Sequence, residues 1–192
     1  NAGSPLAQHS ALALVLEAAN EVAVTTTQSL TSMILCGQLL SGIVAGDTAY
    51  LDQLQRLPAL GRKMMETCRS LGQRIAEDNT LTNFAFVGSG SLQGVAREGQ
   101  LKIKEMVLLP SDSYPLLDFR HGPKSNVDGH MLITLLSCER TQRVEVEFLA
   151  EMKGLGGRLL VICERATSET RALADYLVEL GSGLLRPTSA TG

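Results

Sequence analysis

Four side chains suited to acid–base chemistry lie close together in the middle of this sequence. Glu98, Lys102 and Glu105 are spaced by four and three residues, so they share one stripe of a helix. His121 follows sixteen residues after Glu105, between a bulky aromatic residue and a rigid Gly-Pro pair. A carboxylate and a histidine that titrates near neutral pH suit proton transfer. The simpler interpretation is a solvated charge stripe whose pairs each stabilise the helix by about 0.2–0.5 kcal/mol.

A strand, a glycine turn and a helix are expected to position these side chains. Residues 84–87 are apolar, 88–91 read Gly-Ser-Gly-Ser, and 92–107 have helical periodicity. A strand that leads through a glycine turn into a helix presents ligand groups at the carboxyl edge of an open α/β sheet. The helix side expected to pack on the sheet carries Leu92, Val95, Gly99, Ile103 and Met106.

Three polar residues near this strand and helix are candidates for binding a ligand. Ser89 and Ser91, with the backbone N–H groups of their turn, could cradle a phosphate, although Gly-x-Gly after a strand is a common pattern. Arg120 either pairs with an acid such as Asp118 or Asp128, or faces the ligand. The residues alone leave these alternatives open.

Apolar runs and amphipathic segments alternate in the rest of the carboxyl-terminal half. Strands are expected at 131–136, 158–163 and 174–180, and helices at 141–152 and 167–172. Strands that alternate with helices imply an α/β fold, in which helices flank a doubly wound, parallel sheet.

The amino-terminal part has a different organisation. Residues 11–16 form an apolar run typical of a buried strand, and the hydroxyl-rich stretch 24–33 suits a helix start. Residues 46–80 have helical spacing interrupted by Pro58, which predicts two helices or one kinked helix. The tail 183–192 is rich in Gly, Ser, Thr and Pro, and we expect it to be loose.

Composition excludes several classes of protein. The chain has 192 residues, 44% of them hydrophobic, no Trp and a net charge of −3, which argues against a nucleic-acid partner. Its four cysteines form no C-x-x-C pair, so we expect reduced thiols in a cytoplasmic protein and neither a zinc site nor a disulfide framework. We expect no run to reach the roughly 18 apolar residues of a membrane span, and we expect no signal peptide.

Three motifs together resemble the second half of a tandem sugar isomerase (SIS) domain protein. They are Gly88-Ser-Gly-x-Leu-Gln-Gly-x-Ala-Arg-Glu98, Leu101-Lys-x-x-Glu105 and Phe119-Arg-His-Gly-Pro-Lys-Ser-x-Val-Asp128. The pattern is most similar to the tagatose-6-phosphate ketose/aldose isomerase group, and similar to the isomerase half of glutamine–fructose-6-phosphate aminotransferases. The resemblance implies that 1–45 ends a first SIS subdomain, 46–80 is a helical linker and 81–182 is the second SIS subdomain.

The resemblance also implies an activity. SIS enzymes isomerise or deaminate hexose or hexosamine 6-phosphates through an enediol or enolamine, without metal or organic cofactor, and are commonly dimers. It assigns proton transfer to Glu105, ring opening to His121, charge support to Lys102 and a sugar contact to Ser4. The family's phosphate loop belongs to the first subdomain. The alternatives are a phosphosugar-binding SIS module without turnover and the isomerase part of an aminotransferase.

Overall fold

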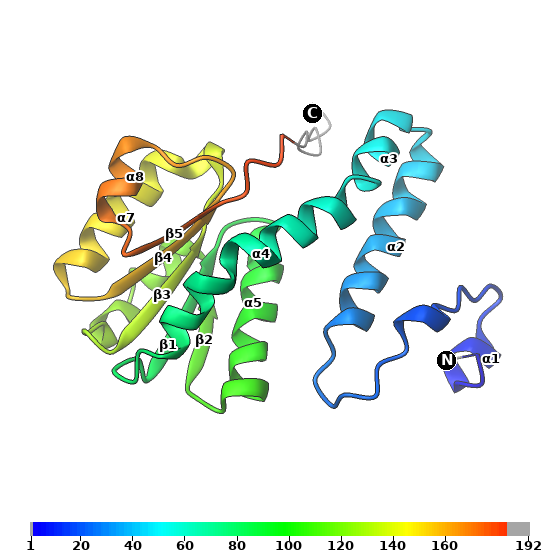
Figure 1. Ribbon diagram of the computed structural model, residues 1–192, viewed down its shortest axis with the longest axis horizontal. Coiled ribbons are helices and arrows are strands. Elements are labelled where there is room, and N and C mark those ends of the chain that lie inside the picture. The colour runs from blue at the N-terminus through cyan, green and yellow to red at the C-terminus, as the bar shows by residue number, and fades with distance from the viewer. Residues whose placement is uncertain (1, 184–192) are drawn as a thin grey trace. The chain divides into compact units, whose positions relative to one another are not determined.

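The computed structural model of the protein describes residues 2–183, so the tail expected at 183–192 lies, apart from its first residue, outside the described residues. The described chain forms two compact units, 2–59 and 60–183. Figure 1 shows the helices and strands of both units in chain order.

The amino-terminal unit is helical, and the strand expected at 11–16 is absent from it. Its elements are α1 (Pro5–His9), a 3₁₀ turn η1 (Glu17–Ala19), α2 (Gln28–Ala45) and α3 (Thr48–Leu54). Leu12 and Leu14 are 91% and 76% exposed, so the prediction of a buried strand is wrong for this chain. A strand needs a neighbour to bond its N–H and C=O groups, and residues 2–59 contain no other strand with which it could pair.

The start of α2 is capped by an acid rather than by the hydroxyl-rich run itself. Both carboxylate oxygens of Glu21 accept hydrogen bonds, from the backbone N–H groups and hydroxyls of Thr27 and Ser29 and from the N–H of Gln28. These bonds, led by the Thr27 hydroxyl, hold the pKa of Glu21 well below its usual range. The hydroxyls therefore act as donors to a carboxylate, which is a structural role.

Helix α2 is apolar as well as long. Its 18 residues have a mean hydropathy of 1.3. This length and composition would allow the helix to cross a membrane, and core helices of soluble proteins meet the same two conditions. Several large apolar side chains of α2 are exposed: Met33, Ile34, Leu40, Ile43 and Val44. Apolar surface of this kind marks an interaction surface more often than a solvated face.

The segment expected to be a linker contains two helices, as one of the two sequence interpretations required. Helix α3 ends at Leu54 and α4 (Leu57–Ala76) begins three residues later. Pro58 lies in the first turn of α4, where its missing N–H has no helical partner to lose. The boundary between the two compact units falls inside this segment, at residues 59 and 60.

A five-stranded sheet organises residues 60–183. Every neighbouring pair of strands is parallel, in the order β2-β1-β3-β4-β5, which confirms the predicted doubly wound α/β fold. The strands are β1 (Asn83–Gly88), β2 (Ser111–Tyr114), β3 (Met131–Leu136), β4 (Arg158–Cys163) and β5 (Tyr176–Glu179). The chain turns to β2 on one side of β1 and then crosses to β3 on the other. The topological switch point therefore lies between the carboxyl ends of β1 and β3.

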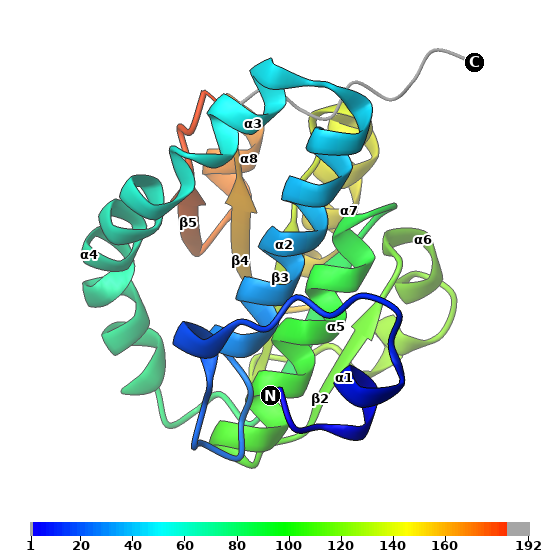
Figure 2. The ribbon, with the colours of Figure 1, turned by 90° about the vertical axis from the view of Figure 1, so that its right-hand side faces the viewer.

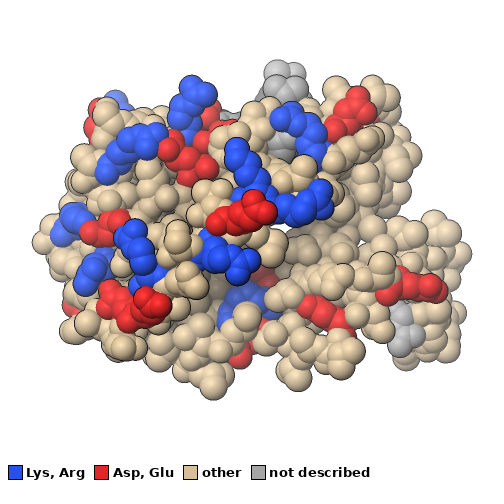
Figure 3. Space-filling model, viewed as in Figure 1, with Lys and Arg blue, Asp and Glu red and all other residues tan. Residues whose placement is uncertain are grey.

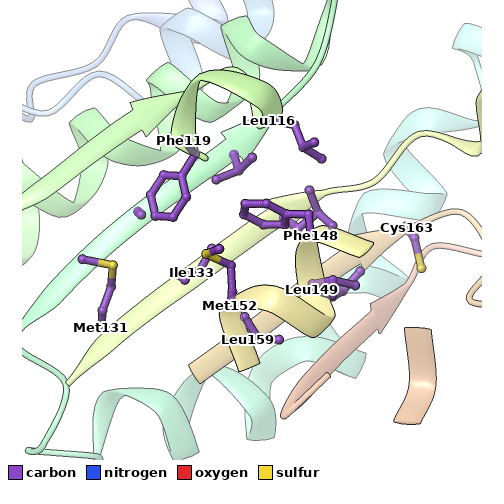
Figure 4. Packing of buried hydrophobic residues seen from close by; sticks show 13 residues of the cluster. Leu116, Phe119, Met131, Ile133, Phe148, Leu149, Met152, Leu159 and Cys163 are labelled. Atoms are coloured by element: carbon purple, nitrogen blue, oxygen red, sulfur yellow. The ribbon is translucent and has the colours of Figure 1, made fainter. Parts of the chain in front are cut away.

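One face of the sheet, here called the α7 face, carries the larger apolar core. It is covered by α6 (Leu116–Phe119), α7 (Gln142–Gly154) and α8 (Ser168–Leu173). Phe119 and Phe148 meet edge to face above Ile133 of the central strand, with ring centroids 5.7 Å apart (Figure 4). All six residues of β3 are buried, as expected for a strand covered on both sides.

The opposite face, here called the α5 face, is covered by α4 and by α5 (Leu92–Lys102), as Figures 1 and 2 show. Its core includes Ile103, which opens the π-helical turn η2 (Ile103–Val107), while Ala96 of α5 is fully buried. Val95 and Met106, expected on the packed side, are 55% and 62% exposed, so their predicted burial is wrong. The extra residue of the π turn rotates Met106 off the stripe that an uninterrupted α-helix would have kept.

Charged groups are mixed on the face of the molecule drawn in Figure 3. In the view of Figure 3, lysines and arginines alternate with aspartates and glutamates and form no broad field of one sign. A phosphate ligand would therefore depend on local donors and not on the overall charge.

The remaining short turns of this unit are η3 (Pro123–Asn126) and η4 (Glu139–Thr141).

Candidate functional site

The glycine turn after β1 is closed by its own backbone bonds. The N–H groups of Leu92, Gln93 and Gly94 donate to the carbonyls of Ser89, Gly90 and Ser91 at 3.1–3.3 Å. Gly90 has φ +59°, which suits glycine. Three N–H groups of the first helical turn are therefore already used and cannot hold a phosphate.

The two serines of this turn keep their hydroxyls available. Ser91 is exposed and Ser89 is half-buried, and within residues 2–183 neither hydroxyl makes a hydrogen bond. The Gln93 amide, oriented to satisfy its neighbours, donates to the carbonyls of Gly88 and Tyr114 at 2.7 and 2.9 Å. Gln93 thereby ties the ends of β1 and β2 together. A ligand role for Ser89 and Ser91 remains a prediction.

A buried acid that sequence reasoning missed organises the loop across the switch point. The side chain of Glu145 on α7 is 2% exposed. It accepts hydrogen bonds from the Ser137 hydroxyl at 2.5 Å, the Cys138 N–H at 2.9 Å and the Thr141 hydroxyl at 2.6 Å. Its place in the first turn of a helix, on the same side as apolar Phe148 and Leu149, was the signal that could have revealed it.

Two further carboxylates hold the loops that follow β4 and β5. Glu164 accepts the Ser182 hydroxyl at 2.8 Å and the Gly183 N–H at 2.9 Å. Glu179 accepts the Ala166 N–H at 2.9 Å, and this bond, with the neighbouring Arg171, lowers its pKa. Along the carboxyl edge from β3 to β5, these carboxylates therefore accept hydrogen bonds from the hydroxyl and N–H groups that could otherwise bind an anion. A phosphate placed beside them would be repelled.

The charge stripe of α5 forms as the spacing predicted. The Lys102 Nζ atom lies 3.2 Å from Glu98 Oε1 and 2.7 Å from Glu105 Oε2. The Glu105 carboxylate, followed by Glu98, raises the pKa of Lys102, which therefore stays protonated at neutral pH. Lys102 can supply positive charge and hydrogen bonds but cannot act as a base.

Glu105 occupies an unusual backbone position. It lies in the π-helical turn η2, which ends at Leu108 in the left-handed conformation with φ +60°. Turns of this kind are rare and are frequent at functional sites. About a third of the Glu105 side chain is exposed, 32%, so it is accessible while one oxygen is held by Lys102.

His121 follows α6 on the other side of the sheet. Phe119 anchors this segment, since it is 1% exposed and contacts the rings of Tyr114 and Phe148. The imidazole is exposed, and the backbone N–H of His121 donates to the backbone carbonyl of Asp118 at 3.1 Å. Gly122 next to it has φ +146°, a conformation that favours glycine.

Arg120 finds an acid, although neither of the two that the sequence suggested. Its Nε atom lies 2.7 Å from Glu151 Oε2 on α7, and Lys124 Nζ lies 2.6 Å from the other oxygen of the same carboxylate. Neither Asp118 nor Asp128 makes an ion pair with Arg120 in the described part of the chain. Its guanidinium is committed to a structural contact, and a substrate contact remains a prediction.

Glu105 and His121 are not brought together within one chain. Ile103, two residues before Glu105, packs on the α5 face, whereas Phe119, two residues before His121, packs on the α7 face. Within residues 2–183 no hydrogen bond or ion pair joins these two side chains. Joint action of Glu105 and His121 on one substrate therefore remains a prediction.

Ser4 belongs to the amino-terminal unit. It caps α1, where its hydroxyl accepts the Ala7 N–H at 3.3 Å. A sugar contact by Ser4 therefore remains a prediction. In the described chain, no cluster of three or more His, Cys, Asp or Glu side chains has the arrangement of a metal site.

Comparison with known proteins agrees with this fold. Residues 82–183 match the family model of the SIS domain. Glutamine–fructose-6-phosphate aminotransferase (isomerizing) from Thermus thermophilus is 27% identical over 187 residues, which cover 92% of this chain and 31% of that protein. The chain therefore spans about a third of the length of this curated relative.

Two solved structures share the fold at low identity. The C-terminal domain of glucosamine-fructose-6-phosphate aminotransferase from Francisella tularensis has a TM-score of 0.76 at 22% identity, covering 92% of this chain and 53% of that one. Tagatose-6-phosphate ketose/aldose isomerase from Escherichia coli has a TM-score of 0.70 at 22% identity, covering 100% and 52%. Because the SIS model matches more than half of its residues, the chain belongs to the SIS domain family.

Proposed function

We propose that this chain supplies the second SIS subdomain of an enzyme that interconverts aldose and ketose forms of a hexose or hexosamine 6-phosphate. The observation that carries the proposal is the accessible Glu105 carboxylate, fixed by Lys102 in a π-helical turn. Membership of the SIS family and similarity to phosphosugar enzymes support the substrate class.

The proposed chemistry is a proton transfer between neighbouring carbons. In the open-chain sugar, Glu105 removes the proton from the carbon beside the carbonyl, and the electron pair moves to the carbonyl oxygen to give an enediolate. The proton of the neighbouring hydroxyl passes to this oxygen, and the protonated Glu105 returns the carbon-bound proton to the former carbonyl carbon, so that the neighbouring carbon becomes the new carbonyl. Lys102 remains charged and lowers the energy of the anionic intermediate, although it lies against two carboxylates that offset part of its effect.

We further propose that the active form is a dimer in the cytoplasm, in which His121 of one subunit opens the sugar ring held near Glu105 of the other. The packing of Ile103 and Phe119, each two residues before one of the two side chains, on opposite faces of the sheet supports this arrangement. The exposed apolar side chains of α2 also favour a covering partner, either a second subunit or another part of a longer protein.

In the proposed organisation, residues 1–45 end a first SIS subdomain, 46–80 form the linker and 81–182 form the second. The phosphate would then be held mainly by residues of the first subdomain. The carboxylates of Glu145, Glu164 and Glu179 along the carboxyl edge of this sheet favour that division, because a phosphate placed beside them would be repelled.

Two other functions have specific support. The named activity of the Thermus thermophilus relative favours the isomerase part of a glutamine-dependent aminotransferase. The separation of Glu105 from His121 within one chain favours a phosphosugar-binding module without turnover. A deaminase would use the same Glu105 chemistry on an amino sugar, after which water hydrolyses the resulting imine to a carbonyl group and ammonia leaves.

Titration with fructose 6-phosphate, tagatose 6-phosphate and galactosamine 6-phosphate tests the proposal, with heat, sugar product and ammonia measured together. Turnover with solvent deuterium entering the sugar, lost in Glu105→Gln and kept in Glu147→Gln, would support the isomerase. Glu147 is the matched control because it lies exposed on α7, away from the stripe. Binding without deuterium exchange would favour the binding module. Turnover that survives Glu105→Gln would refute the assigned role.

A further inference from the structure

One carboxylate on α7 reaches both ends of the loop that carries His121. Glu151 Oε2 lies 2.7 Å from Arg120 Nε, directly before the histidine, and Oε1 lies 2.6 Å from Lys124 Nζ, three residues after it. Each oxygen therefore serves one cation, and both bonds are charge-assisted. The Glu151 side chain is 26% exposed, so solvent screens the contact only in part.

Besides buried Phe119 and the short turn η3, backbone hydrogen bonds hold the loop between these two cations. Two backbone bonds form turns, from the His121 N–H to the Asp118 carbonyl and from the Ser125 N–H to the Gly122 carbonyl. Gly122 beside the histidine adopts φ +146°, a conformation that favours glycine. The direction of the exposed imidazole is therefore set by the path of the loop backbone and not by contacts of the ring.

We infer that Glu151 is a positioning residue that holds the His121 loop on α7 through Arg120 and Lys124. In the folded protein, Lys124 and then Arg120 lower the pKa of Glu151, as expected for a carboxylate that is ionised in this contact. The catalytic meaning of the inference rests on the proposed function of His121. A histidine that serves another subunit needs such a support, since its own subunit's substrate cannot order it.

The position of the loop can be tested without any activity. Amide hydrogen exchange of the 192-residue protein would compare the wild type with Glu151→Gln, which keeps the shape of the side chain and removes its charge. Exchange in residues 120–127 should rise by about tenfold or more, while α7 and the sheet keep their protection. Glu147→Gln, one turn earlier on α7 with only a 3.9 Å contact to Arg143, should leave the loop unchanged.

Two results would overturn the inference. Unchanged exchange in 120–127 would mean that the loop needs no carboxylate, and faster exchange throughout the sheet would mean that Glu151 only stabilises the fold. The second arm uses turnover: Glu151→Gln should lower kcat at least tenfold with KM nearly unchanged, and Glu151→Asp should recover part of the loss. Wild-type kcat in Glu151→Gln would also overturn it.

The two arms separate this inference from the proposed function. If the wild type turns over none of the three sugar phosphates while Glu151→Gln still loosens only 120–127, the proposed activity fails and the positioning role stands. If the wild type is active and Glu105→Gln is inactive, but Glu151→Gln behaves as wild type in both arms, the positioning role fails and the proposed activity stands.

Discussion

The contact of α5 with the sheet at Gly99 gives a quantitative prediction. A methyl group at Gly99 would lie 2.6 Å from Cε1 and 2.7 Å from Cδ1 of the Phe86 ring, so the ring or the helix must move. Overpacking of this kind costs about 1–3 kcal/mol. Alanine also favours the helix over glycine by about 1 kcal/mol. We therefore expect Gly99→Ala to destabilise the protein by up to about 2 kcal/mol.

A matched variant on the same helix removes the uncertainty in the helix preference. Gly94 has no atom within 4 Å of where its Cβ would lie, so Gly94→Ala should stabilise by about 0.5–1 kcal/mol. The helix preference is similar for both variants, and the difference between them then isolates the cost of the Phe86 contact, about 1–3 kcal/mol.

Urea unfolding, analysed with one slope m of free energy against urea concentration for all variants, measures the free energies of unfolding of Gly99→Ala and Gly94→Ala. Phe86→Leu should suppress much of the Gly99→Ala cost, because it removes the ring atoms that the new methyl group meets. Equal stability of Gly99→Ala and Gly94→Ala would refute the packing argument. The result also bears on the site, since Gly99 lies directly after Glu98 and a displaced α5 would carry the charge stripe with it.

Three other predictions follow from buried or paired groups. Glu145→Gln should lower the free energy of unfolding by about 2–3 kcal/mol, because the 2% exposed carboxylate accepts three hydrogen bonds and an amide leaves some of those donors unpaired. Thermal unfolding would show a fall in Tm of roughly 5–10 °C, and no fall would contradict the buried network. Lys124 and Arg120 lower the pKa of Glu151 in the folded protein, so the ionised carboxylate stabilises the fold at pH values above its ordinary pKa of about 4.3. This stability is lost as the pH falls through the lowered pKa. When unfolding is measured from neutral to acid pH, Glu151→Gln should lose less free energy of unfolding than the wild type. Burial raises the pKa of the Cys163 thiol to about 11, so Cys163 should be the last cysteine to react with a thiol reagent in the native protein. Mass spectrometry of the labelled protein measures the rate at each cysteine. Labelling of Cys163 at the rate of the other cysteines would contradict its burial.

The strands of the sheet could be predicted because their signal is local. Residues 131–136 are apolar apart from Thr134, and all six are buried in β3. The run at 11–16 has the same pattern and forms no strand, because its N–H and C=O groups have no strand beside them in residues 2–59. Apolar pattern reports a tendency to be buried, and it does not report whether pairing partners exist.

The same limit separates the parts of the site that were predicted from those that were missed. The contacts of Lys102 with Glu98 and Glu105 follow from helical spacing alone. Arg120, in contrast, pairs with Glu151, which is 31 residues away in the sequence, rather than with a nearby aspartate. Only the packing of α6 against α7 brings them together, and no spacing rule contains that information.

The distribution of carboxylates bears on where the proposed substrate would bind. A parallel sheet normally offers its carboxyl edge to anions. Along β3 to β5, Glu145, Glu164 and Glu179 already accept the hydroxyls and N–H groups that an anion would use. Glu105 lies in the π-helical turn that follows α5, at the opposite end of that helix from the glycine turn where it begins. We therefore expect the sugar to meet this subdomain through the face of α5, and its phosphate to be held by residues outside this sheet.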